Sequence, residues 1–297
     1  MKYTGIALVM LAAVFWGISG GIADILMEKG WDPLIISFYR GVVGFIFFFV
    51  WFITRFRQNW ITSLGFHLWS VLGGIGVAGN FTFYFLTIQD SSVAVAATLM
   101  YTAPIFVLFI SFLFGMEQST WFKWICVFSV VVGIVLLTGA YDPASISTGI
   151  FGVVAGLIAG LSYALFIFGF KNASAIGGPQ TVLTVAFLAF CLILLGFIDI
   201  TETLNVLTSD DIWWFLLLGV VGAGLSFIIY VIGVRQTTPT NASMVAMVEP
   251  VTASLFGVFI LGAELGFIQL FGMGIILVTI TVLSVKQYER NIMYTYD

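Results

Sequence analysis

Long apolar stretches separated by short polar breaks follow one another along the whole chain. Charge-free runs such as Tyr3–Ala23, Leu68–Gln89, Gly149–Phe170 and Leu265–Val285 are each long enough to cross the ~30 Å hydrocarbon core of a bilayer as an α-helix. Breaks fall near residues 28–33, 54–66, 88–91, 115–121, 140–148, 171–178, 199–211, 235–239 and 263–266. Nine breaks leave ten apolar segments, so the pattern predicts an all-α membrane protein with ten transmembrane helices.

Composition supports a chain that works within the bilayer. Of 297 residues, 61% are hydrophobic and 8% are charged, far from the usage of soluble domains. The breaks are too short to hold a folded domain outside the membrane. The first apolar run follows Lys2 but is longer than the core of a signal peptide, so we expect a helix there. Both cysteines fall within apolar segments, which predicts core packing, with no metal and no cofactor.

Lysine and arginine are sorted unevenly between the two sets of breaks. If both chain ends lie in the cytoplasm, only Lys29 falls on the outer side, and the outer breaks collect acids, Asp24 among them. The inner side then holds Lys2, Arg55, Arg57, Lys123, Lys171, Arg235, Lys286 and Arg290. Because basic residues of short loops stay in the cytoplasm, we expect a multi-pass protein of the cell membrane with both termini cytoplasmic.

The two halves of the chain look like copies of one another. A shift of 146 residues superimposes Gly76, Asn80, Tyr84 and Pro104 on Gly222, Ser226, Tyr230 and Pro250. Each copy has five segments, an odd number, so the second copy enters the membrane from the opposite side. We therefore predict two inverted five-helix repeats, residues 1–141 and residues 142–297. Inverted repeats suit alternating access to a site near the middle of the membrane.

Three motifs, in this order and in this duplicated setting, resemble a known family. "AAVFWGIS" lies in the first segment, "FYRGVVG" in the second and "EPVTASLFGVFILGAE" in the ninth. They are similar to the EamA-type, ten-helix carriers of the drug/metabolite transporter superfamily. The resemblance implies a secondary active transporter of the bacterial inner membrane, usually an exporter of amino acids or related metabolites. It also implies a central cavity lined by segments one, three, four, six, eight and nine.

Small multidrug members of that superfamily carry a glutamate within their first helix. Here the first segment has Trp16 and Ser19 instead, and no acid before Asp24. This difference argues against proton-coupled export of cationic drugs by their route.

Two charged residues fall within predicted helices, where an unpaired charge costs at least ~2.5 kcal/mol unless a cavity hydrates it or a proton neutralises it. For Glu249 two interpretations stay open. Its carboxylate lines a cavity, where it binds a substrate ammonium group or a coupling proton, or it holds backbone freed by Pro250. For Arg40 the choice is between a substrate carboxylate, an acidic partner and the membrane interface.

Polar and aromatic residues recur at helical spacing in both halves. Asn80 and Tyr84 share one helical face, as do Ser226 and Tyr230. The predicted lining is completed by Trp16, Ser19, Tyr101 and Tyr163. Together with Arg40 and Glu249 these residues predict an aromatic cavity for a small amphipathic solute.

Pro104 and Pro250 occupy equivalent places, and proline inside a helix removes a hydrogen bond and bends the chain. We predict hinges at both, with static kinks as the alternative.

The same residues also bear on other classes of function. "GISG" at Gly17–Gly20 is similar to the serine motif of intramembrane proteases, but the only histidine, His67, is expected near the opposite surface. A serine protease needs that base beside the serine, so we expect no enzyme. No P-loop motif predicts ATP-driven pumping. Multidrug or nucleotide-sugar transport remains an alternative, although Arg40 alone is a weak phosphate site. A bilayer and a small solute are the expected partners, without nucleic acid. Monomer and homodimer both stay open.

Overall fold

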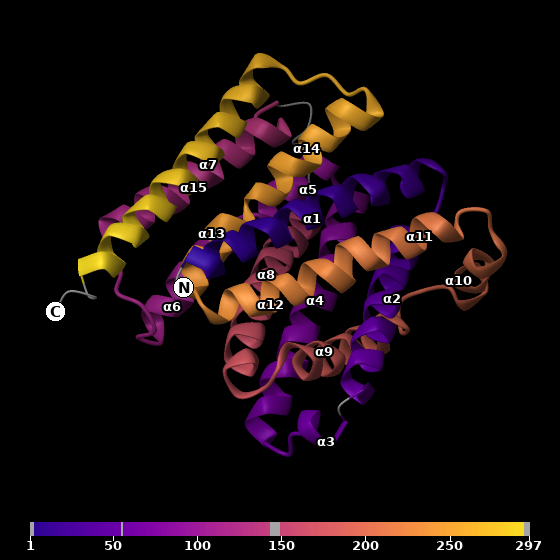
Figure 1. Cartoon of the computed structure of the whole chain (residues 1–297). Helices are drawn as coiled ribbons and strands as arrows, with labels where there is room; N and C mark the ends of the chain where they lie inside the picture. Colours follow the sequence, from indigo (N-terminus) through magenta and orange to yellow (C-terminus); the bar gives the residue numbers. More distant parts are fainter. Residues whose placement is uncertain (1–2, 55, 143–148, 294–297) are drawn as a thin grey trace.

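The computed structural model describes residues 3–54, 56–142 and 149–293 of the chain and is helical throughout these ranges (Figure 1). The first half forms α1 (Tyr3–Glu28), α2 (Pro33–Thr54), α3 (Phe56–Asn59), α4 (Leu64–Asp90), α5 (Val93–Met100), α6 (Ala103–Leu113) and α7 (Trp121–Thr138). The second half forms α8 (Ile150–Ile176), α9 (Pro179–Leu194), α10 (Ile200–Asn205), η2 (Val206–Thr208), α11 (Ile212–Gly219), η3 (Val220–Leu225), α12 (Ser226–Arg235), α13 (Pro239–Ala246), α14 (Val248–Leu261) and α15 (Phe267–Met293).

Within the described ranges, nine helical segments are long and apolar enough to cross a membrane. Three of them are interrupted: α5–α6, α11–η3–α12 and α13–α14. The tenth apolar segment, α9, has 16 residues, which gives about 24 Å of helix. The predicted all-α membrane fold with five segments in each half is therefore confirmed, with α9 as its shortest member.

The two halves pack against each other as inverted copies. The main contacts come in exchanged pairs: α4 packs on α8 as α1 packs on α12, α5 on α8 as α1 on α13, and α4 on α9 as α2 on α11. The last segments of the two halves, α7 and α15, run side by side at one edge of the molecule (Figure 1). A contact and its counterpart with the repeats exchanged are what a twofold relation between the copies produces.

The most extensive contact between the two halves joins α4 to α8, and glycine lies along it. A Cβ atom added to Gly169 would lie 2.6 Å from the Cα atom of Gly73, and one added to Gly76 would lie 2.5 Å from the backbone nitrogen of Phe166. Both helices therefore approach backbone to backbone, which residues with side chains would prevent.

Each repeat breaks its fourth segment at the same place. The segment α5–α6 is interrupted at Tyr101 and Thr102, and α13–α14 is interrupted at Met247, which is Tyr101 shifted by 146. Pro104 and Pro250 lie in the first turn of the second half-helix. The prediction placed the bends at the prolines themselves; the breaks lie two or three residues earlier, because proline disturbs the preceding turn.

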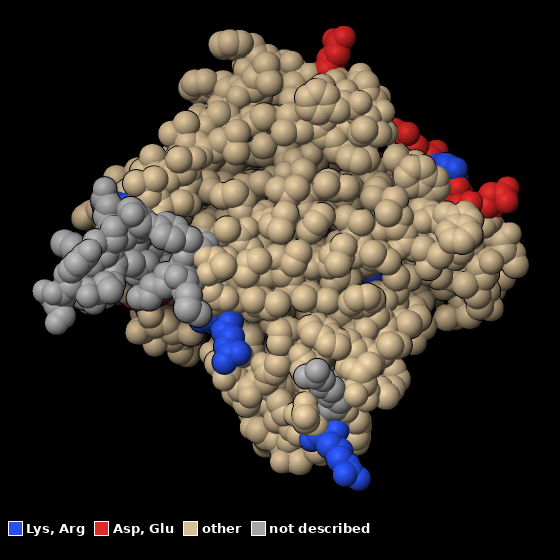
Figure 2. Space-filling model, in the orientation of Figure 1, with Lys and Arg blue, Asp and Glu red and all other residues tan. Residues whose placement is uncertain are grey.

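Acidic and basic residues collect at opposite ends of the bundle. Asp and Glu gather along the upper right edge in Figure 2, and Lys and Arg gather toward the lower edge. The acidic end holds the α1–α2 turn and the start of α11, and the basic end holds α3 and the end of α12 (Figure 1). Lys2 and Arg55 lie outside the described residues, as do both chain termini and residues 143–148, which follow the predicted repeat boundary.

Candidate functional site

A cavity of about 340 Å³ lies between the two repeats, which is within the usual size range of small-molecule sites. It is lined by residues from α1, α4, α5, α8, α12 and α14. These helices belong to segments one, three, four, six, eight and nine, the ones that the family resemblance implies. Residues of α2 line it as well, Arg40 among them. The helices of both copies therefore form one chamber.

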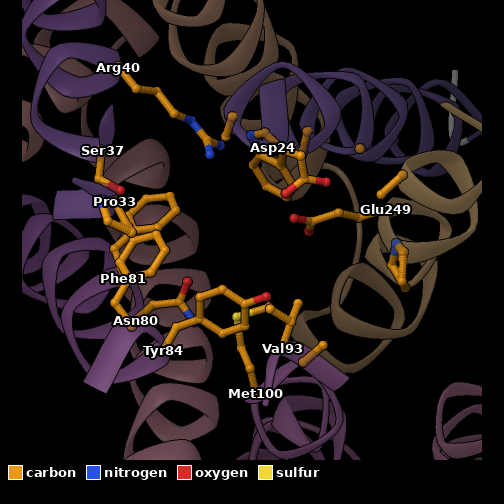
Figure 3. Close-up of a pocket in the computed structure, with 18 of the residues that line it drawn as sticks. Asp24, Pro33, Ser37, Arg40, Asn80, Phe81, Tyr84, Val93, Met100 and Glu249 are labelled. Atoms are coloured by element: carbon orange, nitrogen blue, oxygen red, sulfur yellow. The ribbon is translucent and has the colours of Figure 1, made fainter. Parts of the chain in front are cut away.

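Arg40 extends from α2 into this chamber (Figure 3). Its Nε donates a hydrogen bond to the carbonyl oxygen of Gly222 at 2.9 Å. The guanidinium carbon lies 4.8 Å from the centroid of the Phe81 ring, a distance at which the ring face attracts a cation. Gly222 belongs to η3, a stretch of π-helix, and such stretches are frequent at functional sites. Arg40 is thus held at Nε, and neither contact engages the terminal amino groups of its guanidinium.

Glu249 enters the same chamber from the first turn of α14 (Figure 3). The positive end of that helix dipole favours a carboxylate there. The phenol groups of Tyr101 and Tyr163 interact with this carboxylate. Gly17 of α1 allows the close approach of α14, since a Cβ atom on it would lie 2.6 Å from the carbonyl oxygen of Glu249. Glu249 therefore faces the cavity, and not the backbone freed by Pro250.

Arg40 and Glu249 act on one another electrostatically but form no ion pair. Figure 3 shows them on different walls, both directed at the open space. Within the described ranges, the ion pairs are Lys29 with Asp211 and Lys123 with Glu117. The cavity thus presents a positive and a negative group, separated by space that a solute can enter.

Five further residues of the predicted site line the cavity: Trp16, Asn80, Tyr84, Tyr101 and Tyr163. Asn80 Nδ2 donates to the carbonyl oxygen of Ala159 at 3.1 Å, so its amide is fixed in place. Aromatic side chains that the sequence did not single out, Phe81 and Phe166 for example, complete the wall. The lining combines aromatic surface with few polar groups, as predicted for an amphipathic solute.

Three residues of the predicted site do not line this cavity: Ser19, Ser226 and Tyr230. Ser19 is fully buried and its Oγ donates to the carbonyl oxygen of Trp16 at 2.8 Å. Tyr230 is also fully buried, with its ring 4.9 Å from that of Trp16. The hydroxyl groups of Ser226 and Tyr230 have no hydrogen-bonding partner among the described residues. These side chains lie behind the wall of the chamber.

Asp24 corrects the sequence analysis, which placed it in an outer loop. It belongs to α1, lines the cavity and is exposed there (Figure 3). The signal was present in the sequence, because Asp24 follows Trp16, Gly17 and Gly20 at helical spacings of eight, seven and four residues. The chamber therefore holds two carboxylates and, among the described residues that line it, one cation.

The cavity opens at the acidic end of the bundle. Its lining includes the residues near the acidic ends of four helices, Asp24 of α1, Pro33 of α2, Ile88 of α4 and Val93 of α5. Every residue of α13, toward the basic end, is buried. The chamber is thus open on one side and closed on the other.

Charged residues hold the closed end together. The Glu117 carboxylate accepts a hydrogen bond from Lys123 Nζ at 2.6 Å and another from the backbone nitrogen of Thr240 at 3.0 Å. Lys171 Nζ donates to the carbonyl oxygens of Val234, Arg235 and Thr237 at 2.6–3.0 Å. The turn between α12 and α13 is therefore held from both sides. We call Glu117, Lys123 and Lys171 the basic-end latch.

The EamA-like transporter family is matched twice along the chain, over residues 3–139 and over residues 150–285. The chain therefore belongs to this family. It is a multi-pass membrane transporter and not an enzyme, as the sequence predicted. The predicted boundary after residue 141 falls between the two matched ranges and stays a prediction.

Relatives with similar length bear transporter names. An uncharacterized transporter of Archaeoglobus fulgidus is 28% identical over 93% of this chain and 94% of its own. The uncharacterized inner membrane transporter YicL of Salmonella typhimurium is 24% identical over 96% and 97%. A solved structure titled "Crystal structure of protein" covers 95% of this chain and 96% of its own with a TM-score of 0.73 at 14% identity. That last likeness concerns the fold alone.

Proposed function

We propose that this transporter exports a small zwitterion, an amino acid or a close relative, by alternating access. The observation that carries the proposal is the placement of Arg40 and Glu249 on different walls of one cavity, unpaired with each other. A solute with a carboxylate and an ammonium group matches both charges. Arginine binds a carboxylate through two parallel hydrogen bonds, and its terminal nitrogens point toward the space where the solute would lie.

Charge compensation favours such a solute over an uncharged one. While the cavity is open, water can solvate both groups. When the cavity closes, each unpaired charge costs ~2.5 kcal/mol or more in the middle of the membrane. A bound zwitterion offsets both costs at once, so the loaded carrier closes more readily than the empty one.

A second route, toward the basic end, is supported by unpartnered polar atoms. Buried hydroxyl groups without a hydrogen-bonding partner include those of Ser111, Ser226, Tyr230, Thr237 and Thr240. Leaving a buried hydroxyl group without a hydrogen bond costs about 1–3 kcal/mol of folding free energy, so such groups are rare unless they have a function. We infer that these groups face water or solute when the basic-end latch opens. In the state that is open at the basic end, Ser226 and Tyr230 then line the cavity, as Asn80 and Tyr84 line it in the state described here.

The sorting of charge favours a location in the cell inner membrane with cytoplasmic termini. The basic end, with its latch, then faces the cytoplasm, and the open cavity faces outward. Release of solute to the outside is the last step of export. The relative from Salmonella typhimurium is likewise named an inner membrane transporter.

Protons are the coupling ion that the cavity favours. Glu249 is the acidic group placed deepest in the chamber, and a proton neutralises it when no ammonium group is bound. Proton and solute then exclude each other at one carboxylate, which gives exchange between them. The cavity is built within one chain, so binding does not need a second copy. Both a monomer and a homodimer are compatible with this function.

Other carrier functions fit the cavity less well. A nucleotide sugar needs several cations for its phosphates, and Arg40 is the one cation among the described lining residues. A cationic drug would be repelled by the positive charge of Arg40. The protease alternative lacks a base, since His67 contacts the carbonyl oxygen of Ile61 at 2.8 Å and Ser19 bonds to its own helix.

Counterflow in proteoliposomes tests the proposal. Vesicles loaded with one unlabelled amino acid accumulate the labelled form if the carrier recognises it, and a panel of amino acids identifies the solute. Arg40→Gln and Glu249→Gln each lower the initial rate by about tenfold or more, since a hydrogen bond to a charged group contributes ~1.5–3 kcal/mol. Arg57→Gln and Asp210→Asn, at exposed charges, are matched controls. Full transport by either cavity variant would contradict the proposal, as would a panel without any substrate.

A further inference from the structure

We propose that Asp24 is a second cation-binding group of the cavity, and that the preferred solute carries one carboxylate and two positive groups, as a dibasic amino acid does. This inference rests on the proposed function, because it assigns the rest of the same solute. Arg40 and Glu249 account for a carboxylate and one ammonium group. Asp24 has no such assignment.

The charges that line the cavity do not balance. Arg40 contributes one positive charge, and Asp24 and Glu249 contribute two negative charges. A zwitterion therefore leaves one carboxylate uncompensated, and a solute with net charge +1 leaves none. Compensation is worth more in a cavity surrounded by lipid than at a protein surface, because low dielectric strengthens electrostatic interaction.

Asp24 has no cation of its own. It forms no salt bridge with any residue in the described ranges, and the charged residue that acts on it electrostatically is another acid, Glu28. Its side chain is exposed to the cavity and directed into it in Figure 3, on the same wall region as Glu249. Water solvates it only as long as the cavity stays open.

Helix geometry separates the backbone positions of Asp24 and Glu249 along α1 by about two turns. Gly17 contacts the backbone of Glu249, and Asp24 lies seven residues farther along α1, about 10 Å at 1.5 Å per residue. The Glu249 side chain reaches into the space between them. Tyr84 lies within electrostatic reach of both carboxylates. Two amines separated by a chain of several methylene groups span such a site.

The aromatic lining suits that chain. Tyr84, Phe85 and Met27 line the cavity together with Asp24. The methylene groups of a lysine-like side chain can pack on this apolar surface while the terminal ammonium group reaches a carboxylate. An aromatic face near a cation adds further attraction.

A pair of probes of equal chain length tests the assignment. L-lysine and L-norleucine differ by the terminal amine, and their dissociation constants at pH 7 are measured by thermal stabilisation of the full chain in detergent. Lysine binds about fivefold more tightly than norleucine, because a partly exposed charge pair contributes up to ~1 kcal/mol. In Asp24→Asn this ratio falls to about one. Asp210→Asn, at an exposed acid outside the cavity lining, keeps the wild-type ratio and serves as the matched control.

The possible failures are distinguishable. Equal binding of lysine and norleucine by the wild type overturns the inference and leaves the proposed function standing. A fivefold preference that survives in Asp24→Asn overturns the role of Asp24. Binding of neither probe, together with an empty counterflow panel, overturns the proposed function and this inference with it. Thermal midpoints without ligand show whether Asp24→Asn folds as the wild type does.

Discussion

Glu117 and Glu264 end equivalent helices of the two repeats, and they have opposite surroundings. Glu117 follows α6, its side chain is 4% exposed, and it bonds to Lys123 and to the first turn of α13. Glu264 follows α14, is exposed and forms no salt bridge in the described ranges. Each helix ends at a glycine with positive φ, Gly115 at 63° and Gly262 at 72°. Sequence equivalence therefore does not give equal contacts.

The difference between the two glutamates records which end of the cavity is closed. Thr240, shifted back by 146 residues, is Ala94 in the first turn of α5. Ser92 and Thr238, the caps of α5 and α13, are related by the same shift, and each accepts a hydrogen bond from the backbone nitrogen three residues later. The two repeats thus provide the same docking site at both ends. We expect Glu264 to reach the first turn of α5 when the acidic end closes.

The largest expected effect comes from removing the closed latch. Glu117→Ala deprives Lys123 and the Thr240 backbone of their acceptor, which weakens closure of the basic end by ~1.5–3 kcal/mol. The population of the opposite state then rises about tenfold to a hundredfold. Thiol labelling measures this shift. Cysteine at Ser243, which is buried on α13, gains reactivity, and cysteine at Ser254, which lines the cavity, loses it.

The labelling experiment uses a background with Cys126→Ala and Cys191→Ala, since both native cysteines are buried and free. Lys286→Gln is a control that removes an exposed charge at the same end. If Ser243→Cys stays unreactive in the Glu117→Ala chain, the latch does not hold the gate.

Equivalent glycines give the next test. A Cβ atom on Gly76 would lie 2.8 Å from the carbonyl oxygen of Ser162, whereas one on Gly222 would lie 2.6 Å from the Ser19 Cβ atom. Overpacking of this kind costs about 1–3 kcal/mol. We expect Gly222→Ala to cost less in a Ser19→Gly background, and Gly76→Ala to cost the same with or without Ser162→Gly. Unfolding free energies in a double-mutant cycle measure both. Equal rescue at both sites would mean that the two seams are alike.

The predicted partner of Glu264 gives a smaller effect. Glu264→Gln replaces a charged acceptor by a neutral one at the end that is open here, which removes ~1 kcal/mol from closure of that end. Turnover then falls about fivefold, while the stability of the open state stays unchanged because Glu264 forms no ion pair with any described residue. Counterflow rates and thermal midpoints are the measurements, with Glu28→Gln as the control. Unaltered turnover would break the proposed equivalence.

The smallest effect concerns the ion pair at the acidic end. Hydrogen bonds from Lys29 and Trp31 lower the pKa of Asp211 below its usual 3.8. The stabilisation is therefore present above pH 3.8 and is lost as the pH falls through the lowered pKa. Asp211→Asn unfolds about a degree or two below the wild type at pH 7, since Lys29 is 45% exposed and its charge is screened. The two thermal midpoints converge in acid. A constant difference at all pH values would assign the effect to packing.

Hydropathy and the internal repeat were enough to predict the fold, because both can be read from the order of residue types without knowing any contact. Ten apolar segments and two copies follow from the sequence alone. The breaks at Tyr101 and Met247 did not follow, since proline marks a disturbed turn without fixing which residue leaves the helix. The π-helical stretch at Val220–Leu225 has no signal beyond its glycines.

The candidate site was predicted in part, for a reason that lies in the inversion. Asn80 and Tyr84 line the cavity, whereas their counterparts Ser226 and Tyr230 are buried behind its wall. Inverted copies place equivalent residues nearer opposite ends, and this cavity is open at one end. Sequence symmetry cannot say which end that is. Asp24 was missed because a charge near a predicted helix end is counted as a loop residue.

The glycine seam between α4 and α8 joins the two halves of the chain backbone to backbone. Where Gly73 meets Gly169, backbone lies on backbone, and a larger residue at either position would force the two helices apart. We expect this seam to stay intact while the two ends of the cavity open and close. We expect a chemical crosslink between α4 and α8 to leave transport intact, whereas a crosslink between α6 and α13 abolishes transport.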